Sequence, residues 1–322
     1  MKAIIYTNYG SPDVLEYKEV EKPSPKDDEV LVKIHAASLN AADWHLLRAD
    51  PFLARLFSGL LKPKFNILGA DIAGVVEATG TNVKQFHAGD EVFGAISECG
   101  WGGFAEYTTA TENALVLKPA KLTFEEAAAV PLASITAIQA LRNKGKIQQG
   151  QKVLVNGASG GVGIFAVQIA KSFGAEVTAV CSTSKIDITH KIGADIIIDY
   201  SKEDFTKNGK SYDLIIAANG FHPISDYKKA LSKNGIYVMT GGTGAQMAQA
   251  IFLGPLMSIG SKKMCALSAK SNKQDLIFIK GLIEADKVVP VIDRRYPLIE
   301  TAEAMRYLEE GHAGGKIVIN IQ

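Results

Sequence analysis

The chain has 322 residues, of which 47% are hydrophobic, and its 35 Lys and Arg nearly cancel 34 Asp and Glu. This length exceeds one typical hydrophobic core and predicts two domains. The balanced charge gives no overall field that favours nucleic acid or an anionic membrane. Cys99, Cys181 and Cys265 lie far apart, which argues against a disulfide framework and a metal cluster. Without a signal-peptide core or an apolar run long enough to span a bilayer, we expect a cytoplasmic protein.

The first third of the chain shows short strands separated by turns. These runs lie at 3–6, 29–35, 72–78, 90–94 and 102–107. A helix start follows, with Thr123 as the N-cap and Glu126 in the position of a capping box. The pattern predicts a β-rich domain over residues 1–122.

A short apolar strand, Val153 to Val155, runs into a glycine-rich turn that ends at Gly163. Helical spacing of apolar residues follows the turn, and Glu176 to Val180 is typical of a second strand. In such a β-α-β unit the glycines let backbone amides approach a pyrophosphate at the positive end of the helix dipole. Ala158 replaces the first glycine of the usual G-x-G-x-x-G pattern, so a turn that only joins strand to helix stays an alternative.

Further buried-strand runs occur at 195–198, 213–217 and 235–239, with helical stretches between them. Strands that alternate with helices predict a parallel sheet covered on both faces. We therefore expect an α/β protein with a doubly wound domain over residues 123–288.

The residues around the glycine turn resemble a known signature. Those that carry the likeness are Gly150, Gln151, Leu154, Ala158, Ser159, Gly160, Gly161, Gly163, Gln168 and Lys171. They are similar to the quinone oxidoreductase (zeta-crystallin) branch of the medium-chain dehydrogenase/reductases. The resemblance implies a GroES-like catalytic domain over 1–122, a Rossmann NADPH-binding domain over 123–288, and a return of 289–322 to the catalytic domain.

Zinc alcohol dehydrogenases of this superfamily carry a cysteine and a histidine as metal ligands. Asn40 stands at the position of the cysteine and Ala70 at that of the histidine. Because a zinc site needs three or four N, S or O ligands, the loss of two predicts that no metal is bound. Without a Lewis acid, simple alcohol oxidation is disfavoured, and hydride transfer to a conjugated carbonyl becomes the expected reaction.

By the same resemblance, Asn40 and His45 are the candidate catalytic donors, with His45 where relatives carry a tyrosine. The alternative for His45 is a side chain that caps or packs the helix beginning near Asp43, which we interpret as an N-terminal helix charge. Thr136 resembles a threonine beside the nicotinamide. Its alternative is a hydroxyl that bonds the backbone of its own helix.

Cofactor contacts are expected at Ser159, Gly160, Gly161 and Val162 in the glycine turn. The strand that ends at Cys181 is followed by Ser182, Thr183 and Lys185, without the acid that binds a ribose 2′-hydroxyl in NAD-binding folds. Hydroxyl donors and a lysine suit a 2′-phosphate, so we expect NADPH. Tyr200 matches a tyrosine that relatives place near the adenosine phosphate. An ordinary polar loop is the alternative.

The sequence thus predicts a zinc-free, NADPH-dependent reductase of a quinone or an α,β-unsaturated carbonyl. Two alternatives stay open: reduction of enoyl thioesters, and a nucleotide-binding regulatory protein with little turnover. The expected partner is a small-molecule quinone or enone, with no nucleic acid and no membrane span. A homodimer is implied only by the resemblance.

Overall fold

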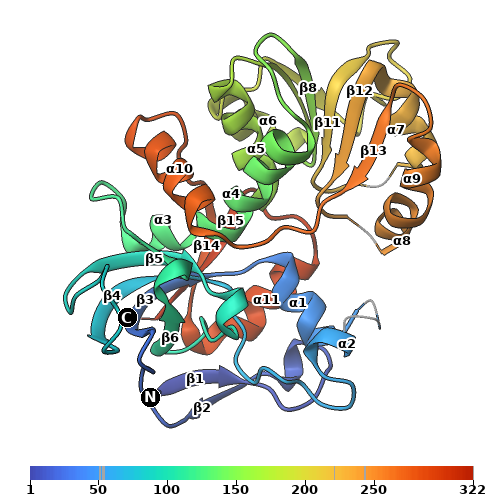
Figure 1. Ribbon diagram of the computed structural model, residues 1–322. Coiled ribbons are helices and arrows are strands. Elements are labelled where there is room, and N and C mark those ends of the chain that lie inside the picture. Colours follow the sequence, from blue (N-terminus) through green and yellow to red (C-terminus); the bar gives the residue numbers. More distant parts are fainter. Residues whose placement is uncertain (51, 53–54, 221, 243, 322) are drawn as a thin grey trace. The chain divides into compact units, whose positions relative to one another are not determined.

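The structure is a computed structural model that describes residues 1–50, 52, 55–220, 222–242 and 244–321. The chain forms two compact units (Figure 1). Unit 1 comprises Met1–Leu132, Ser271–Glu284 and Pro290–Gln322, and unit 2 comprises Ala133–Lys270 and Ala285–Val289. The chain therefore returns to unit 1 after it has built most of unit 2.

The main sheet of unit 1 has the strand order β14-β15-β3-β4-β5-β7, and β6 pairs with β3. Neighbours are antiparallel except β14 and β15, which are parallel. Its strands are β3 (Glu29–Ser38), β4 (Asp71–Thr79), β5 (Glu91–Ala95), β6 (Tyr107–Thr111), β7 (Leu115–Leu117), β14 (Ile292–Pro297) and β15 (Lys316–Asn320). A separate antiparallel pair joins β1 (Lys2–Ile5) to β2 (Glu16–Glu19).

The α-helices of unit 1 range from 4 residues in α2 to 12 residues in α10. They are α1 (Ala41–Arg48), α2 (Arg55–Ser58), α3 (Phe124–Ala128), α10 (Lys273–Glu284) and α11 (Thr301–Glu309). The predicted capping box at α3 is confirmed, because Thr123 Oγ1 accepts the Glu126 amide at 3.2 Å while Glu126 Oε2 accepts the Thr123 amide at 2.9 Å. Since α3 packs against β3 and β4, unit 1 extends to Leu132, beyond the predicted boundary at Leu122.

The sheet of unit 2 is parallel throughout, in the order β10-β9-β8-β11-β12-β13. Its strands are β8 (Lys152–Asn156), β9 (Glu176–Cys181), β10 (Ile196–Asp199), β11 (Tyr212–Ala217), β12 (Leu231–Met239) and β13 (Lys263–Ala266). This arrangement confirms the predicted α/β class with a doubly wound parallel sheet. Buried aliphatic side chains on β8, β9 and β11 form the centre of its core.

Helices connect the strands of unit 2. They are α4 (Pro131–Ile138), which begins in unit 1, α5 (Gly161–Ser172), α6 (Ile186–Lys191), α7 (Ile224–Ala230), α8 (Gly244–Ala248) and α9 (Gly254–Met257). Helix α5 packs against β8 and β9, and α7 packs against β12. No helix in the described ranges combines the length and apolar character needed to cross a membrane.

Several elements differ from the sequence predictions, and the short strands β2 and β7 were not predicted. The run 102–107 is not a strand, since β6 begins only at Tyr107 and Ala105 forms an isolated bridge with Ala3. Strand β13 was missed. It is an edge strand in which Lys263 is exposed, so its sequence lacks the continuous apolar run that identifies the central strands.

Candidate functional site

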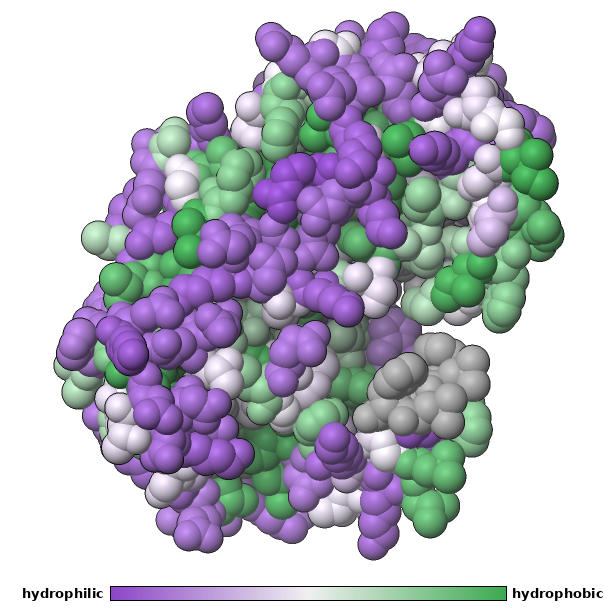
Figure 2. Space-filling view, viewed as in Figure 1, coloured by the Kyte–Doolittle hydropathy of each residue, from purple (hydrophilic) through white to green (hydrophobic). Residues whose placement is uncertain are grey.

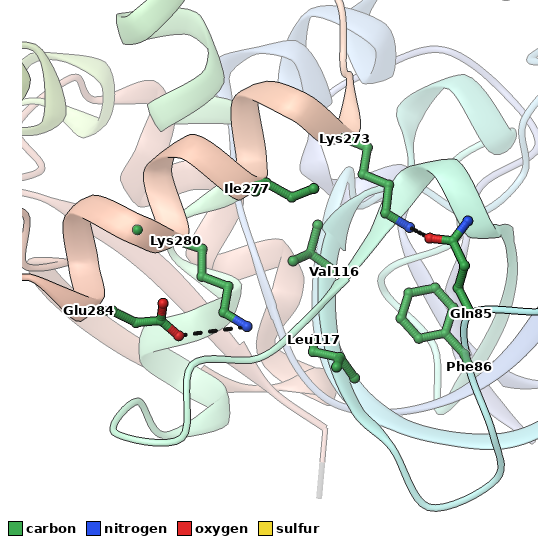
Figure 3. Close-up of a pocket in the computed structure, with 9 residues that line it drawn as sticks. Gln85, Phe86, Val116, Leu117, Lys273, Ile277, Lys280 and Glu284 are labelled. Atoms are coloured by element: carbon green, nitrogen blue, oxygen red, sulfur yellow. Dashed lines mark hydrogen bonds and ion pairs between the residues drawn. The ribbon is translucent and has the colours of Figure 1, made fainter.

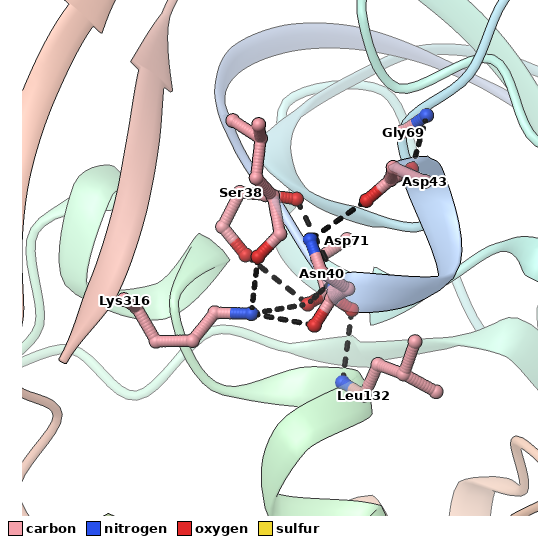
Figure 4. Close-up of polar contacts among 8 residues, drawn as sticks. Ser38, Asn40, Asp43, Gly69, Asp71, Leu132 and Lys316 are labelled. Atoms are coloured by element: carbon pink, nitrogen blue, oxygen red, sulfur yellow. Dashed lines mark hydrogen bonds and ion pairs between the residues drawn. The ribbon is translucent and has the colours of Figure 1, made fainter. Parts of the chain in front are cut away.

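A buried ion pair lies in unit 1, near the start of α1 (Figure 4). Lys316 at the start of β15 is 2% exposed, and Asp71 at the start of β4 is fully buried. Lys316 Nζ lies 3.4 Å from Asp71 Oδ2 and donates to the Leu39 carbonyl at 2.9 Å and to Asn40 Oδ1 at 2.6 Å. A buried ammonium is tolerated when acceptors replace its water shell, and here three oxygens do so.

The Asp71 carboxylate has further hydrogen-bond donors besides the lysine. Its Oδ2 accepts from Ser38 Oγ at 3.1 Å and from Asn40 Nδ2 at 2.8 Å, and its Oδ1 accepts the Leu132 amide at 2.9 Å. These bonds join β3, β4, β15 and the start of α4. The carboxylate is therefore held in one orientation, with donors on both oxygens.

Asp43 lies beside this ion pair in the first turn of α1, as predicted, but it differs from an ordinary helix-terminal charge. Its Oδ2 accepts the Asn40 amide at 2.7 Å and its Oδ1 accepts the Gly69 amide at 3.0 Å. Complete burial raises the pKa of Asp43 to about 7, against the lowering effect of these two bonds. Burial therefore favours the protonated form of this carboxyl more than it would for an exposed aspartate in a first helical turn.

The side chain of Asn40 is engaged at both ends. Oδ1 accepts from Lys316, and Nδ2 donates to Asp71 and, at a long 3.5 Å, to the Ser38 carbonyl. The second amide hydrogen therefore has only a weak acceptor. Lys316 was not predicted, because a lysine that opens a strand is usually solvated.

The structure does not bring His45 into this cluster. Its Nδ1 donates to the Asp50 carbonyl at 2.5 Å, and its ring stacks on Trp44 with centroids 3.7 Å apart. Both contacts lie at the end of α1 and match the capping and packing alternative. A catalytic role for His45 remains a prediction.

The predicted dinucleotide turn lies in unit 2 between β8 and α5. Gly157 has φ +79°, and a Cβ there would lie 2.7 Å from the Asn219 backbone nitrogen. A Cβ at Gly163 would lie 2.1 Å from the Gly157 carbonyl oxygen. Glycine is therefore required at both positions by close backbone packing, which explains why the turn folds although Ala158 replaces one glycine.

Gly160 differs from these two glycines. It is the N-cap of α5, its conformation is extended, and a Cβ there would meet only the Gly157 carbonyl, at 3.5 Å. Open space thus lies in front of the helix N-terminus, where the first amides lack intrahelical acceptors. Ser159, Gly160, Gly161 and Val162 surround this end of α5, so the turn fits a pyrophosphate.

The other predicted cofactor residues gather at the carboxyl ends of β9 and β10. Ser182 directly follows β9, and Thr183 and Lys185 form the short turn that leads into α6. Tyr200 follows β10, is exposed, and donates its amide to the Cys181 carbonyl at 3.1 Å. Thr136 lies apart from these residues, buried within α4.

Asp199, at the carboxyl end of β10, was not predicted from the sequence as part of this site. Asp199, the last residue of β10, accepts Thr183 Oγ1 at 2.5 Å and Ser201 Oγ at 2.7 Å. These two hydroxyl donors, first Thr183 and then Ser201, lower the pKa of Asp199 to about 2. The hydroxyl hydrogen of Thr183 is thus directed to Asp199, and only its oxygen lone pairs face other groups. The sequence shows an acid at the end of an apolar run, but the strand order that places β10 next to β9 is needed to bring Asp199 to Thr183.

Two family models match parts of this chain. Residues 26–120 match the alcohol dehydrogenase GroES-like domain family, and residues 192–319 match the zinc-binding dehydrogenase family. The chain is 37% identical to the chloroplast envelope quinone oxidoreductase homolog of Arabidopsis thaliana, over 99% of this chain and 98% of that one. The chain belongs to the quinone oxidoreductase branch of the medium-chain dehydrogenase/reductase superfamily.

Other members of the superfamily are also similar. An NADPH-dependent alkenal/one oxidoreductase of Arabidopsis thaliana is 33% identical, over 99% of this chain and 79% of that one. The quinone oxidoreductase structure from Coxiella burnetii superposes with a TM-score of 0.88 at 30% identity, covering 100% of this chain and 99% of that one. These relatives support an oxidoreductase that uses a nicotinamide cofactor.

Zinc does not fit the residues that this member of the superfamily carries. Asn40 and Ala70 supply neither a thiolate nor an imidazole, and an ammonium lies 2.6 Å from Asn40 Oδ1, where it would repel a divalent cation. Within the described ranges, no group of three His, Cys, Asp or Glu side chains could hold a metal ion.

A cavity of about 410 Å³ opens within unit 1 between α10 and β7 (Figure 3). Phe86, Val116 and Ile277 contribute apolar surface, and Lys273 closes one end by donating to Gln85 Oε1 at 2.6 Å. None of its lining residues is a predicted site residue. We therefore assign it no part in the chemistry.

Proposed function

We propose that this protein is a zinc-independent, NADPH-dependent reductase that transfers hydride to a quinone or an α,β-unsaturated carbonyl. The observation that carries the proposal is the bond from the buried Lys316 ammonium to Asn40, the residue that, by the resemblance, stands where zinc-dependent relatives carry a ligand cysteine. The nicotinamide supplies the hydride when it is bound. The residues of the chain then need to bind, orient and stabilise charge without a Lewis acid.

A conjugated acceptor can be reduced with hydrogen-bond donors alone to stabilise the developing charge. As hydride adds, the developing negative charge spreads over an enolate or a hydroquinone, so one or two hydrogen-bond donors stabilise it sufficiently. Asn40 is the proposed donor because its second amide hydrogen has only a 3.5 Å contact with the Ser38 carbonyl. The charge-assisted bond from Lys316 to Asn40 Oδ1 polarises the amide and makes its N–H a stronger donor.

The glycine turn and the ends of β9 and β10 are the proposed cofactor site. Ser159, Gly160, Gly161 and Val162 would hold the pyrophosphate at the N-terminus of α5. Ser182 and Lys185 would bind the 2′-phosphate, and Thr183 would position the loop through its bond to Asp199. Thr136 and Tyr200 are proposed at the nicotinamide and adenosine ends, respectively, on the basis of the family resemblance.

The names of the relatives support the acceptor class. Besides the quinone and alkenal/one enzymes, a 2-methylene-furan-3-one reductase of Solanum lycopersicum is 37% identical, over 99% of this chain and 79% of that one. Each of these acceptors is a carbonyl conjugated to a double bond or is a quinone. Some relatives are named chloroplastic or mitochondrial, so a cytoplasmic location stays a prediction, as does a homodimer.

The direct test follows NADPH oxidation at 340 nm with a panel of quinones, enones, enals and enoyl thioesters. Turnover of quinones or enones, with NADPH preferred over NADH, supports the proposal. Exclusive turnover of thioesters would establish the enoyl-thioester alternative, and nucleotide binding without turnover of any acceptor would establish the regulatory one. Elemental analysis and activity after chelation test the metal, because stoichiometric zinc that is needed for turnover would refute zinc independence.

A further inference from the structure

One face of α10 carries both apolar and basic side chains toward the cavity in unit 1 (Figure 3). Lys273, Ile277 and Lys280 are spaced four and three residues apart, which places them on the same side of the helix. In Figure 3 these side chains extend from α10 toward Val116 and Leu117 on β7. The cavity of about 410 Å³ therefore has an apolar middle between two lysines.

The middle of the cavity presents apolar surface to solvent. Leu117 is 45% exposed and Ile277 is 43% exposed, whereas Phe86, which also lines the cavity, is 4% exposed. Figure 2 shows hydrophobic surface over α10 among hydrophilic surroundings. A hollow of this volume lies within the range of small-molecule sites. A ligand that covers these side chains would remove apolar surface from water, which favours binding.

Lys280 has a poor partner for its charge. Its side chain is only 23% exposed, so much of the water around it is lost. In the part of the chain that the structure describes, it pairs with Glu284, one turn along α10, at 3.6 Å, which is longer than a hydrogen bond. The Glu284 side chain is 52% exposed and can turn toward solvent. An anion in the cavity would give this ammonium a hydrogen bond that no described residue supplies.

The other end of the cavity carries a second ammonium, bound to uncharged groups. Lys273 Nζ donates to Gln85 Oε1 at 2.6 Å and to the Glu112 carbonyl at 2.9 Å, and it lies 4.9 Å from the centre of the Phe86 ring. Burial lowers the pKa of Lys273, and the Glu112 carboxylate, which accepts the Gln85 amide at 2.6 Å, offsets this only in part. The described lining residues thus carry two ammoniums against the single carboxylate of Glu284, which favours an anionic ligand.

Gly281 keeps the cavity open beside Lys280. It lies within α10, where glycine is less favourable than alanine. A Cβ at this position would meet nothing within 4 Å, and the φ of Gly281 lies outside the left-handed region. Neither packing nor backbone conformation explains this glycine, whereas a ligand that lies over the helix at this position does.

We propose that this cavity binds a medium-chain monocarboxylate, with the carboxylate at Lys280. The apolar body of the ligand lies against Phe86, Leu117 and Ile277. The ammonium and the carboxylate form a charge-assisted hydrogen bond, while the acyl chain covers side chains that are otherwise exposed. Lys273 and Lys280 are about 10 Å apart along the helix axis, a distance that a medium-chain acyl group spans. The site is separate from the proposed reductase chemistry, so neither inference rests on the other.

The experiment is a ligand-observed NMR titration of the intact protein with octanoate and with octanamide, which has the same chain without the charge. We expect octanoate to bind with a Kd of about 1 mM or below, and octanamide to bind at least about tenfold more weakly. Lys280→Met should weaken octanoate binding about tenfold. Glu284→Gln should strengthen it about threefold, because this variant removes a competing carboxylate.

Gly281→Leu should abolish octanoate binding by filling the cavity, without lowering the midpoint of urea denaturation, because leucine favours a helix more than glycine does. The matched control is Lys229→Met, since Lys229 Nζ lies 2.8 Å from Asp226 Oδ1 on α7 with its side chain 73% exposed, and this variant should bind octanoate like wild type. Absence of octanoate binding, equal affinity for octanamide, or unchanged affinity in Lys280→Met and Gly281→Leu would overturn the proposal. A loss in Lys229→Met as large as that in Lys280→Met would overturn it as well.

Discussion

Replacing Lys316 by methionine tests how far unit 1 depends on its buried ion pair. Methionine keeps much of the volume of the lysine stem but leaves Asp71 without its cation and Asn40 Oδ1 without its donor. Both partners are almost completely buried, at 2% and 0% exposed, so water cannot replace the lost contacts. Breaking a buried pair by removing one partner costs about 3–5 kcal/mol, and we expect a loss of that size in the unfolding free energy of unit 1.

A second substitution separates charge from packing. In the double variant Lys316→Met, Asp71→Asn the buried charge is gone, and the Asn40 amide can rotate so that its free oxygen accepts from the new amide. At least half of the lost stability should return, because a neutral polar group with partners costs far less to bury than an unpaired carboxylate. The structure provides a surface control in the same unit, Lys26→Met, because Lys26 Nζ lies 3.3 Å from Glu29 Oε1 with 80% of the lysine exposed.

Urea denaturation followed by tryptophan fluorescence is the assay. The two tryptophans, Trp44 and Trp101, both lie in unit 1, so their emission reports this unit separately from unit 2. Lys26→Met should change stability by less than about 1 kcal/mol, as expected for a surface pair of similar N–O distance. A loss of under about 1 kcal/mol in Lys316→Met, or a double variant no more stable than the single one, would refute the reasoning.

Three further predictions concern single residues. Asn40→Ala should lower kcat by about 10²–10³-fold with NADPH binding kept, and unchanged turnover in this variant and in His45→Ala would leave both residues with structural roles only. Lys185→Ala should raise KM for NADPH about tenfold and leave KM for NADH nearly unchanged, whereas equal losses would contradict a 2′-phosphate contact. The folded-state pKa of Asp43, about 7, lies above its ordinary 3.8, so the stability it contributes is present below pH 3.8 and is lost as pH rises through 7. Wild type should therefore lose up to about 1.4 kcal/mol per pH unit from this group in that window, and Asp43→Asn should show a flatter profile by urea denaturation at pH 5, 6 and 7.

The parallel sheet and the glycine turn could be predicted because their signals are local. Each central strand is a continuous apolar run, and Gly163 follows β8 at the spacing that packs a helix against a strand. The edge strand β13 gives a weaker local signal, since one side faces solvent. Local patterns therefore identify the buried strands better than the strand that ends the sheet.

The partners of the candidate site residues are set by long-range pairing, and sequence patterns do not contain it. Asn40 was selected by position, but its contact with Lys316 joins residues 276 positions apart. The bond from Thr183 to Asp199 likewise depends on β10 lying next to β9. The sequence shows which side chains can form hydrogen bonds. The order of the strands decides which partner each of these side chains meets.

The position of β15 in the sheet has a consequence for the order of folding during synthesis. Strand β15 pairs with β3, although translation separates Ser38 from Val318 by nearly the whole chain. Until β15 emerges from the ribosome, β3 lacks this neighbour and Asp71 lacks its cation. Most of unit 2, residues 133–270, is synthesised before that point and can form its parallel sheet first. Unit 2 can thus complete its sheet before unit 1 does, and the nascent unit 1 keeps the end of β3 unpaired, which is an edge open to aggregation while translation continues.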